Sequence, residues 1–286
     1  MELFIQALAA GLVIGCVYCL ISIGLTMIFS IMRIVNFAHG EFFMLGGYIG
    51  WFVVNHYVSN YWLAVLIAVL AGGILGFLTE KIYSRVYGKN LLSMFMISLG
   101  LVLILQNGSQ IIFGAMSRSL FNFYPTVREI GFVRINDQRL IIVGATIMAI
   151  AGVLLFFKYT KMGKAMRATA GNRRGAGVVG IKAERMSMFA FIGGIALTAL
   201  AGVLLAPLYS LLPTIGDRLT GVAFTCIVIG GIGSIGGAAI AGFAVGIVEN
   251  IFGTYFSTAW AFAPMFVLLL LVLVVKPLGL FGKEVA

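Results

Sequence analysis

Charged side chains are the scarcest feature of this 286-residue chain. Only 10% of its residues are Asp, Glu, Lys or Arg, and only 9 residues are acidic. An average soluble domain contains about 25% charged residues. Hydrophobic residues make up 62% of the chain, and its mean hydropathy is +1.12. This composition excludes an ordinary soluble protein and predicts membrane-spanning helices.

Residues that build metal sites, disulfides and catalytic centres are also few. The 3 cysteines, Cys16, Cys19 and Cys226, lie in apolar runs and are expected to be inert buried thiols. His39 has no second His, Cys or carboxylate cluster near it in the sequence, so no metal site is predicted. No phosphate-binding P-loop motif occurs. We therefore expect neither an enzyme nor a chain that binds a cofactor itself.

Long runs without any charged residue are abundant, and they define the expected fold. Run 42–79 breaks at 55–60 and contributes to two spans, and run 219–248 contains a glycine cluster that opposes one continuous helix. The prediction is an all-α, polytopic membrane bundle, with residues 1–286 as one transmembrane domain. It has about eight membrane segments, with a broken or re-entrant helix pair near 219–252. The uncharged runs are 3–32, 42–79, 90–117, 140–157, 186–216, 219–248 and 250–275.

Basic residues outnumber acidic ones and give a net charge of +10, but they gather in a few loops. The loop 158–185 holds eight Lys or Arg residues and one acid in 28 positions. Since Lys and Arg are retained on the cytoplasmic side, this clustering predicts an orientation rather than a nucleic-acid partner. With the amino terminus outside and the carboxyl terminus inside, 14 of the 19 basic residues are cytoplasmic. Loop 114–139 then becomes the main extracytoplasmic segment.

Two motifs carry polar residues or glycines at membrane depth. The first contains Asn36, His39, Gly40 and Glu41, and the second contains Gly230, Gly231, Gly233 and Ser234. Each indicates a helix break, direct lining of a solute path, or both, because polar groups are costly in a membrane. The pairs Gly233/Gly237 and Gly242/Gly246 have the spacing of helix-packing faces.

Other polar residues have simpler interpretations. The patch Gln106, Asn107, Ser109 and Gln110 is expected to form interhelical hydrogen bonds, with solute contact as the alternative. The pairs Asp217-Arg218 and Glu249-Asn250 are expected to be anchors at the membrane surface.

The basic loop 158–185 has a second feature besides its charge. Its glycines divide it into a short helix between turns, and Ala165, Ala168, Asn172 and Ala176 recur at helical spacing. That small-residue face suits docking into a groove of a partner protein, although the loop's charge alone could reflect only orientation and anionic lipid.

Three segments together resemble the permeases of branched-chain amino-acid ABC importers, specifically the H-type subunit. They are Gly24–Phe29 with Asn36–Glu41 and Gly46–Tyr48; Tyr159–Ala168 through Gly180-Ile181; and Ala223–Thr225 with Ile229–Ile235, Gly242 and Gly246. The ending Lys276–Gly282 is also similar to the family's ending. Two departures are Gly236, where relatives usually have Pro, and the basic stretch Gly171–Gly175, where they often carry an acid.

The resemblance implies a multi-pass subunit of a complex in the bacterial inner membrane. Its expected partners are a second permease (heterodimeric, or homodimeric), two cytoplasmic ATPases that use ATP and Mg, a periplasmic solute-binding protein and membrane lipid. Segment 162–181 would contact an ATPase. The expected coupling residues are Met162, Gly163, Lys164, Ala165, Arg167, Ala168, Asn172 and Gly180.

The expected function is ATP-driven import of branched-chain or related small amino acids. Urea, short-chain amides or another small polar solute are alternative cargoes for the same architecture. A passive channel or an ion-coupled carrier is the alternative from a different class.

Overall fold

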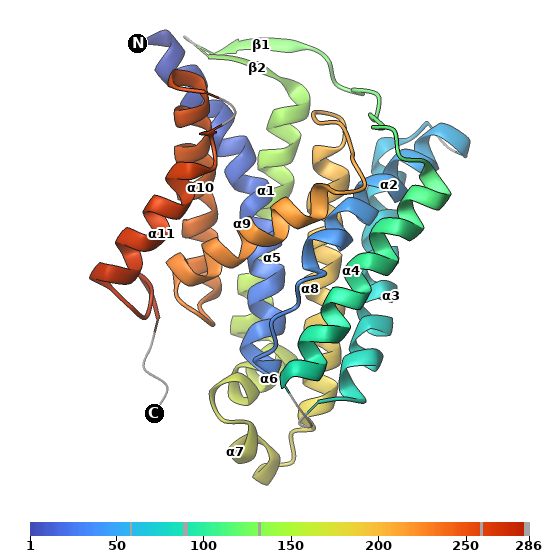
Figure 1. Cartoon of the computed structure of the whole chain (residues 1–286), viewed down its shortest axis with the longest axis vertical. Coiled ribbons are helices and arrows are strands. Elements are labelled where there is room, and N and C mark those ends of the chain that lie inside the picture. Colours follow the sequence, from blue (N-terminus) through green and yellow to red (C-terminus); the bar gives the residue numbers. More distant parts are fainter. Residues whose placement is uncertain (58, 88–90, 131–132, 258–259, 283–286) are drawn as a thin grey trace.

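The structure is a computed structural model that describes residues 1–57, 59–87, 91–130, 133–257 and 260–282. Helices dominate the described part of the chain (Figure 1). In chain order the elements are α1 (Glu2–Met32), α2 (His39–His56), α3 (Tyr61–Ser84), α4 (Leu91–Phe113), β1 (Val127–Ile130), β2 (Val133–Asn136), α5 (Asp137–Tyr159), α6 (Lys161–Gly171), α7 (Arg173–Val178), α8 (Ala183–Leu205), α9 (Ile215–Gly230), α10 (Ile235–Tyr255) and α11 (Ala263–Val275).

The bundle confirms the expectation of a polytopic helical membrane protein. Within the described residues, six helices are long and apolar enough to cross a membrane: α1, α3, α4, α5, α8 and α10. Helices α2, α9 and α11 are shorter; α2 and α9 pack among the long helices, and α11 packs at the edge against α9 and α10. The region near 219–252 was expected to hold two short helices. Instead, α9 is short, and α10 is long enough to cross a membrane because it continues past Glu249 to Tyr255.

Glycines let the central helix α1 approach its neighbours closely. A Cβ atom added to Gly246 of α10 would lie 2.4 Å from the backbone nitrogen of Gly15 in α1, and one added to Gly242 would lie 2.7 Å from that of Cys19. The predicted packing face at Gly242/Gly246 is therefore confirmed. The prediction that Gly233 and Gly237 share a helix-packing face was wrong, because Gly233 lies in the non-helical break before α10.

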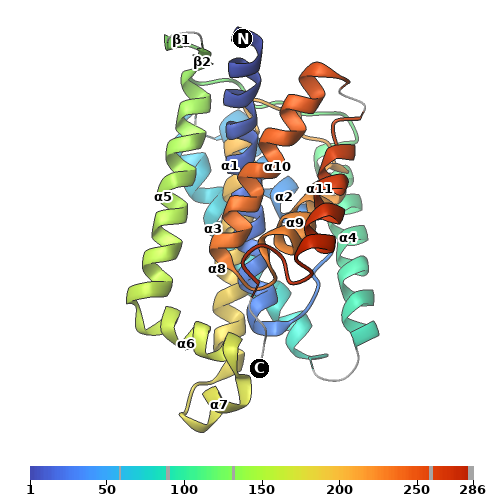
Figure 2. The same ribbon diagram turned by 90° about the vertical axis from the view of Figure 1, so that its left-hand side faces the viewer.

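The two ends of the bundle carry different elements (Figures 1 and 2). The amino terminus lies at the same end as the antiparallel ribbon of β1 and β2, and α6 and α7 lie at the opposite end. The ribbon is a small two-stranded addition to a fold that is otherwise helical, as expected. It is tied to α1 because Gln6 Nε2 donates to the Arg134 carbonyl at 2.7 Å and Arg134 N–H donates to Gln6 Oε1 at 3.0 Å.

Loop 158–185 contains two helices rather than the single short helix that was expected. Thr160 caps α6, accepting from Gly163 N–H at 2.9 Å, and Asn172 caps α7, accepting from Gly175 N–H at 2.8 Å. Because Asn172 interrupts the helix and Ala176 is buried, the predicted stripe from Ala165 to Ala176 is not one continuous face.

Candidate functional site

The first predicted break lies between α1 and α2. Helix α1 ends at Met32, and Arg33 takes a left-handed conformation with φ 53° whose N–H donates to the Phe29 carbonyl at 2.8 Å. Helix α2 then begins at His39. Helix α2 therefore starts within the polar motif 36–41.

Asn36 and His39 connect this break to three long helices. Both side chains are fully buried. Asn36 Oδ1 accepts from Ala38 N–H at 3.1 Å and from the Tyr83 hydroxyl of α3 at 3.2 Å. His39 Nε2 lies 3.1 Å from the Ile21 carbonyl of α1 and 2.7 Å from Thr198 Oγ1 of α8. A carbonyl can only accept, so Nε2 carries the proton and donates.

Gly40 and Glu41 connect the same break to α9 and α4. Gly40 N–H donates to Thr220 Oγ1 at 2.9 Å, and a Cβ at Gly40 would lie 2.0 Å from the Gly216 carbonyl oxygen, so only glycine permits this approach. Glu41 is buried, and its Oε1 accepts from Gln106 Nε2 at 3.0 Å. That bond confirms the interhelical role expected for Gln106. Residues 36–41 thus form a junction, the 36–41 junction, where α2 is tied to five other helices.

The sequence analysis missed the partners in this junction. Tyr83, Thr198 and Thr220 supply the hydroxyl groups that contact Asn36, His39 and Gly40. Thr198 is an isolated polar residue in an apolar stretch, whereas Tyr83 and Thr220 lie near the charged ends of their helices, so none of them gave a strong signal. What identifies them is the three-dimensional approach of helices that are far apart in the sequence.

The second predicted break lies between α9 and α10, and the structure contains it. Helix α9 ends at Gly230, and Gly231 (φ 95°) and Gly233 (φ 88°) adopt backbone conformations that favour glycine. Ser234 explains the start of α10, because its Oγ accepts from Gly237 N–H at 3.1 Å.

The carboxyl-terminal segment completes the end of α9. The last carbonyls of a helix have no partner within the helix. Here Leu280 N–H donates to the Ile229 carbonyl at 2.9 Å, and Phe281 N–H donates to the Gly230 carbonyl at 3.1 Å. The approach is so close that a Cβ at Gly231 would lie 2.3 Å from Gly282 nitrogen. This docking of the tail gives a structural role to the family-like ending Lys276–Gly282.

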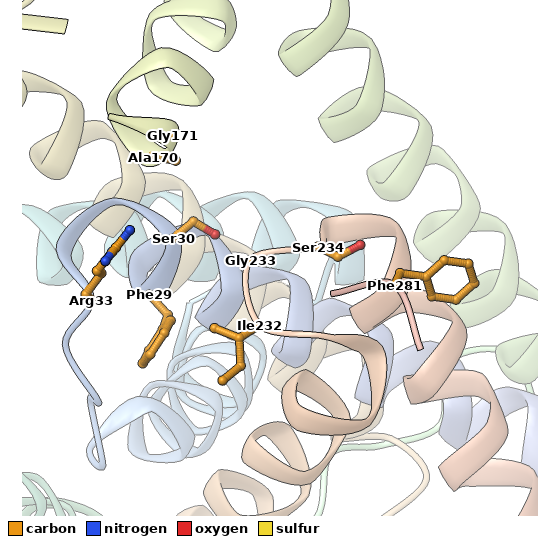
Figure 3. Close-up of a pocket in the computed structure, with 9 residues that line it drawn as sticks. All are labelled: Phe29, Ser30, Arg33, Ala170, Gly171, Ile232, Gly233, Ser234 and Phe281. Atoms are coloured by element: carbon orange, nitrogen blue, oxygen red, sulfur yellow. The ribbon is translucent and has the colours of Figure 1, made fainter. Parts of the chain in front are cut away.

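The two breaks do not form one site. The 36–41 junction contacts α9 near its first residues, at Gly216 and Thr220, whereas the glycines lie at its last residue and beyond. Helix α9 connects them and runs obliquely across the other helices (Figure 1). The second break instead borders a cavity of about 560 Å³. Phe29 in the last turn of α1, Arg33 just after it and Ala170 near the end of α6 also line this cavity (Figure 3).

The expected coupling residues divide by exposure. Lys164, Arg167, Ala168, Asn172 and Gly180 are exposed, and Met162 and Ala165 are partly buried. Gly163 is buried where α6 meets α5, since a Cβ there would lie 2.3 Å from the Phe156 carbonyl oxygen. Gly163 therefore sets the packing of α6, and the exposed members are the ones that a partner could touch.

An ion pair between the buried Glu249 and the exposed Arg218 corrects one expectation. Glu249 is buried rather than an anchor at the membrane surface. Its Oε2 accepts from the Tyr18 hydroxyl at 2.8 Å, and its Oε1 lies 2.6 Å from Arg218 Nη2. Arg218 also lies over the Phe262 ring, 3.8 Å from the centroid. These contacts tie α9 to α1 and α10.

Several known proteins are similar to this chain along nearly its whole length. The high-affinity branched-chain amino acid transport system permease protein LivH of Salmonella typhimurium is 34% identical, with 98% of this chain and 96% of that protein covered. LivH of Escherichia coli K12 is 32% identical and BraD of Pseudomonas aeruginosa 31%, each with the same coverage. No solved structure gave a significant match.

A family model provides the broader assignment. Residues 7–275 match the model described as the branched-chain amino acid transport system / permease component. This range includes the 36–41 junction, both helix breaks and the loop that carries α6 and α7. The chain belongs to the family of permease components of branched-chain amino acid transport systems.

Proposed function

We propose that this chain is the membrane subunit of an ATP-driven importer of branched-chain or related small amino acids in the bacterial inner membrane. Its partners are a second permease subunit, two cytoplasmic ATPases that bind ATP and Mg, and a periplasmic solute-binding protein. The chain itself hydrolyses no ATP. The names of its relatives, all permease proteins of such transport systems, support the solute class.

The observation that carries the mechanism is the position of α6 opposite the second helix break. Ala170 and Gly171 at the end of α6 border the same cavity as Ile232, Gly233 and Ser234 (Figure 3). If an ATPase displaced α6, this cavity would leave space for the end of α9 to shift with it. Helix packings switch between discrete arrangements, which suits alternating access.

Helix α9 is the element that this motion would shift. Its start is held by Thr220 and Gly216 at the 36–41 junction, and its end by the docked tail. Asn36, His39, Gly40 and Glu41 would then act by positioning α9 along the solute path. Gly230, Gly231, Gly233 and Ser234 would act as its hinge.

The test is uptake of labelled leucine, isoleucine and valine into proteoliposomes that contain the whole complex. Wild type should accumulate these solutes only with ATP and solute-binding protein. The exposed Arg167→Glu variant, which reverses a charge on α6, should lower uptake at least tenfold through loss of ATPase contact.

The matched control is Lys158→Glu, which reverses an exposed charge in the same loop at the end of α5. It should retain uptake within about twofold, in line with the small effect of most exposed charges. ATP-independent flux through the chain alone would instead indicate a channel or carrier. Uptake of urea or short amides without uptake of leucine, isoleucine or valine would refute the solute class.

A further inference from the structure

Two adjoining cavities lie where α6 and α7 meet the end of α1. One is the cavity of about 560 Å³ beside the second break, and its neighbour is about 410 Å³. They share Ser30, Arg33, Ala170 and Gly171 as a common wall. The two cavities differ sharply in the chemistry of their linings.

The smaller cavity is basic. Arg33, Arg173 and Arg174 line it, and no acidic side chain does so among the described residues. The hydroxyl groups of Ser30 and Thr169 in the same lining already donate to carbonyls of their own helices. Three guanidinium groups together match the oxygen atoms of a phosphate group.

The Arg173 side chain is positioned to bind a phosphate group. Its guanidinium carbon lies 4.2 Å from the centroid of the Tyr87 ring, which fixes the side chain over the aromatic face. Its Nη1 atom is buried and has no hydrogen-bond partner within the described part of the chain. A buried donor of a cationic group without an acceptor is costly, so an external anion would relieve that cost.

Arg33 provides independent support. It is the only non-glycine residue with positive φ among those described, and it stands at the carboxyl-terminal cap of α1, where glycine is usual. Its side chain extends toward Ala170 and Gly171 across the cavity (Figure 3). An unfavourable backbone conformation is thus combined with a charge aimed into the site.

The larger cavity is apolar on its far side. Phe29, Ile232 and Phe281 line it together with the glycines of the second break. A phosphate next to an apolar slot is the pattern of a phospholipid, whose headgroup is anionic and whose acyl chain is apolar. Basic pockets of this kind between membrane helices bind anionic headgroups. An acidic side chain of a protein partner would satisfy the arginines but leave the apolar slot empty.

We propose that these two cavities form a binding site for one anionic phospholipid. Its phosphate lies among Arg33, Arg173 and Arg174, and an acyl chain lies along Phe29, Ile232 and Phe281. The lipid would connect α6 to the second helix break. The inference concerns the basic Gly171–Gly175 stretch and does not depend on which solute is carried.

The test is lipid binding by the full chain, purified in detergent and stripped of lipid, measured by native mass spectrometry. The probes are phosphatidylglycerol, phosphatidylcholine and inorganic phosphate. Wild type should bind one added phosphatidylglycerol and bind phosphatidylcholine at least tenfold more weakly. Arg174→Gln should weaken phosphatidylglycerol binding about fivefold, and the Arg33→Gln/Arg173→Gln double variant about 25-fold.

Lys158→Gln is the matched control, since it removes an exposed positive charge from the same loop without lining either cavity. It should change phosphatidylglycerol affinity less than twofold. Arg174 is exposed, so its variant keeps the test valid even if the double variant folds poorly. Equal binding of the two lipids, unchanged affinity in Arg174→Gln, or saturation by inorganic phosphate alone would each overturn the proposal. Uptake assays are separate, so failure here leaves the proposed transport function untouched.

Discussion

Glu249 is an acidic residue enclosed in the helical bundle, and its partners explain how the bundle tolerates it. The Tyr18 hydroxyl donates to one carboxylate oxygen, and Arg218 pairs with the other. Isolated charge at this depth is expensive, whereas a paired and hydrogen-bonded carboxylate is tolerated. In the 36–41 junction, by contrast, Glu41 has the neutral partner Gln106 on Oε1, and its buried Oε2 has no hydrogen-bond partner among the described residues.

Loss of the Glu249 carboxylate should destabilise the protein. In Glu249→Leu the buried Tyr18 hydroxyl has no acceptor, which costs about 1–3 kcal/mol, and Arg218 loses its ion pair. Glu249→Gln keeps an oxygen that accepts from Tyr18, so its loss should be smaller. The measurement is the midpoint of thermal unfolding in detergent.

Tyr18→Phe separates the two contacts, because it removes the hydroxyl donor and keeps the Arg218–Glu249 pair. Its midpoint should fall less than that of Glu249→Leu. A Glu249→Leu protein as stable as wild type would show that these contacts contribute nothing to the fold.

At the scale of secondary structure, the end of the short helix α9 is stabilised by hydrogen bonds from outside the helix. Its final carbonyls are satisfied by the backbone of Leu280 and Phe281 rather than by its own residues. A Cβ added to Gly279 would lie 2.5 Å from Gly231 nitrogen, so the tail and the break fit only through their glycines. The end of α9 and the carboxyl-terminal segment therefore form one packing unit.

Replacing Gly231 with alanine should displace the tail from α9. The residue has φ 95°, which costs a non-glycine residue about 1–3 kcal/mol, and its Cβ would collide with Gly282. We expect Gly231→Ala to lower the thermal midpoint and to lower uptake by the reconstituted complex.

Gly236→Ala is the control from the next helix turn. A Cβ at Gly236 meets nothing within 4 Å, and alanine is the better helix former, so stability should be unchanged or slightly higher. If both alanine variants behave alike, the close contact between the break and the tail is not what holds α9.

At the scale of the whole molecule, the two ends differ in charge and structure. The end with α6 and α7 carries most of loop 158–185 and the cavities lined by arginine, and the opposite end carries the β1–β2 ribbon (Figure 2). The positive-inside rule assigns the α6–α7 end to the cytoplasm. This orientation is a prediction that labelling can test.

Single cysteines at the two ends should react differently with a membrane-impermeant maleimide in spheroplasts. Phe121 is 72% exposed and Val178 is 89% exposed. Phe121→Cys should be labelled in intact spheroplasts, and Val178→Cys only after the membrane is permeabilised. The native cysteines Cys16, Cys19 and Cys226 are buried and should give little background. The reverse labelling pattern would invert the topology.

Much of the architecture could be predicted because its causes are local. Uncharged runs long enough to span lipid located the long helices, and the glycines near 230–237 located the second break. Two predictions that depended on depth or on a shared helix face were wrong. Glu249 was expected at the membrane surface, and the stripe from Ala165 to Ala176 was expected on one helix.

By itself, then, the sequence determined that this protein is a bundle of membrane helices with breaks in the motif 33–41 and the glycine cluster 230–237, because hydropathy and glycine content act on neighbouring residues. Only the tertiary structure decided which groups meet. It brings Thr220 to Gly40, Leu280 to Ile229, and Arg33 to Arg173 around one cavity. Such pairings depend on how helices that are distant in the sequence pack, and that packing cannot be inferred from residue spacing along the chain.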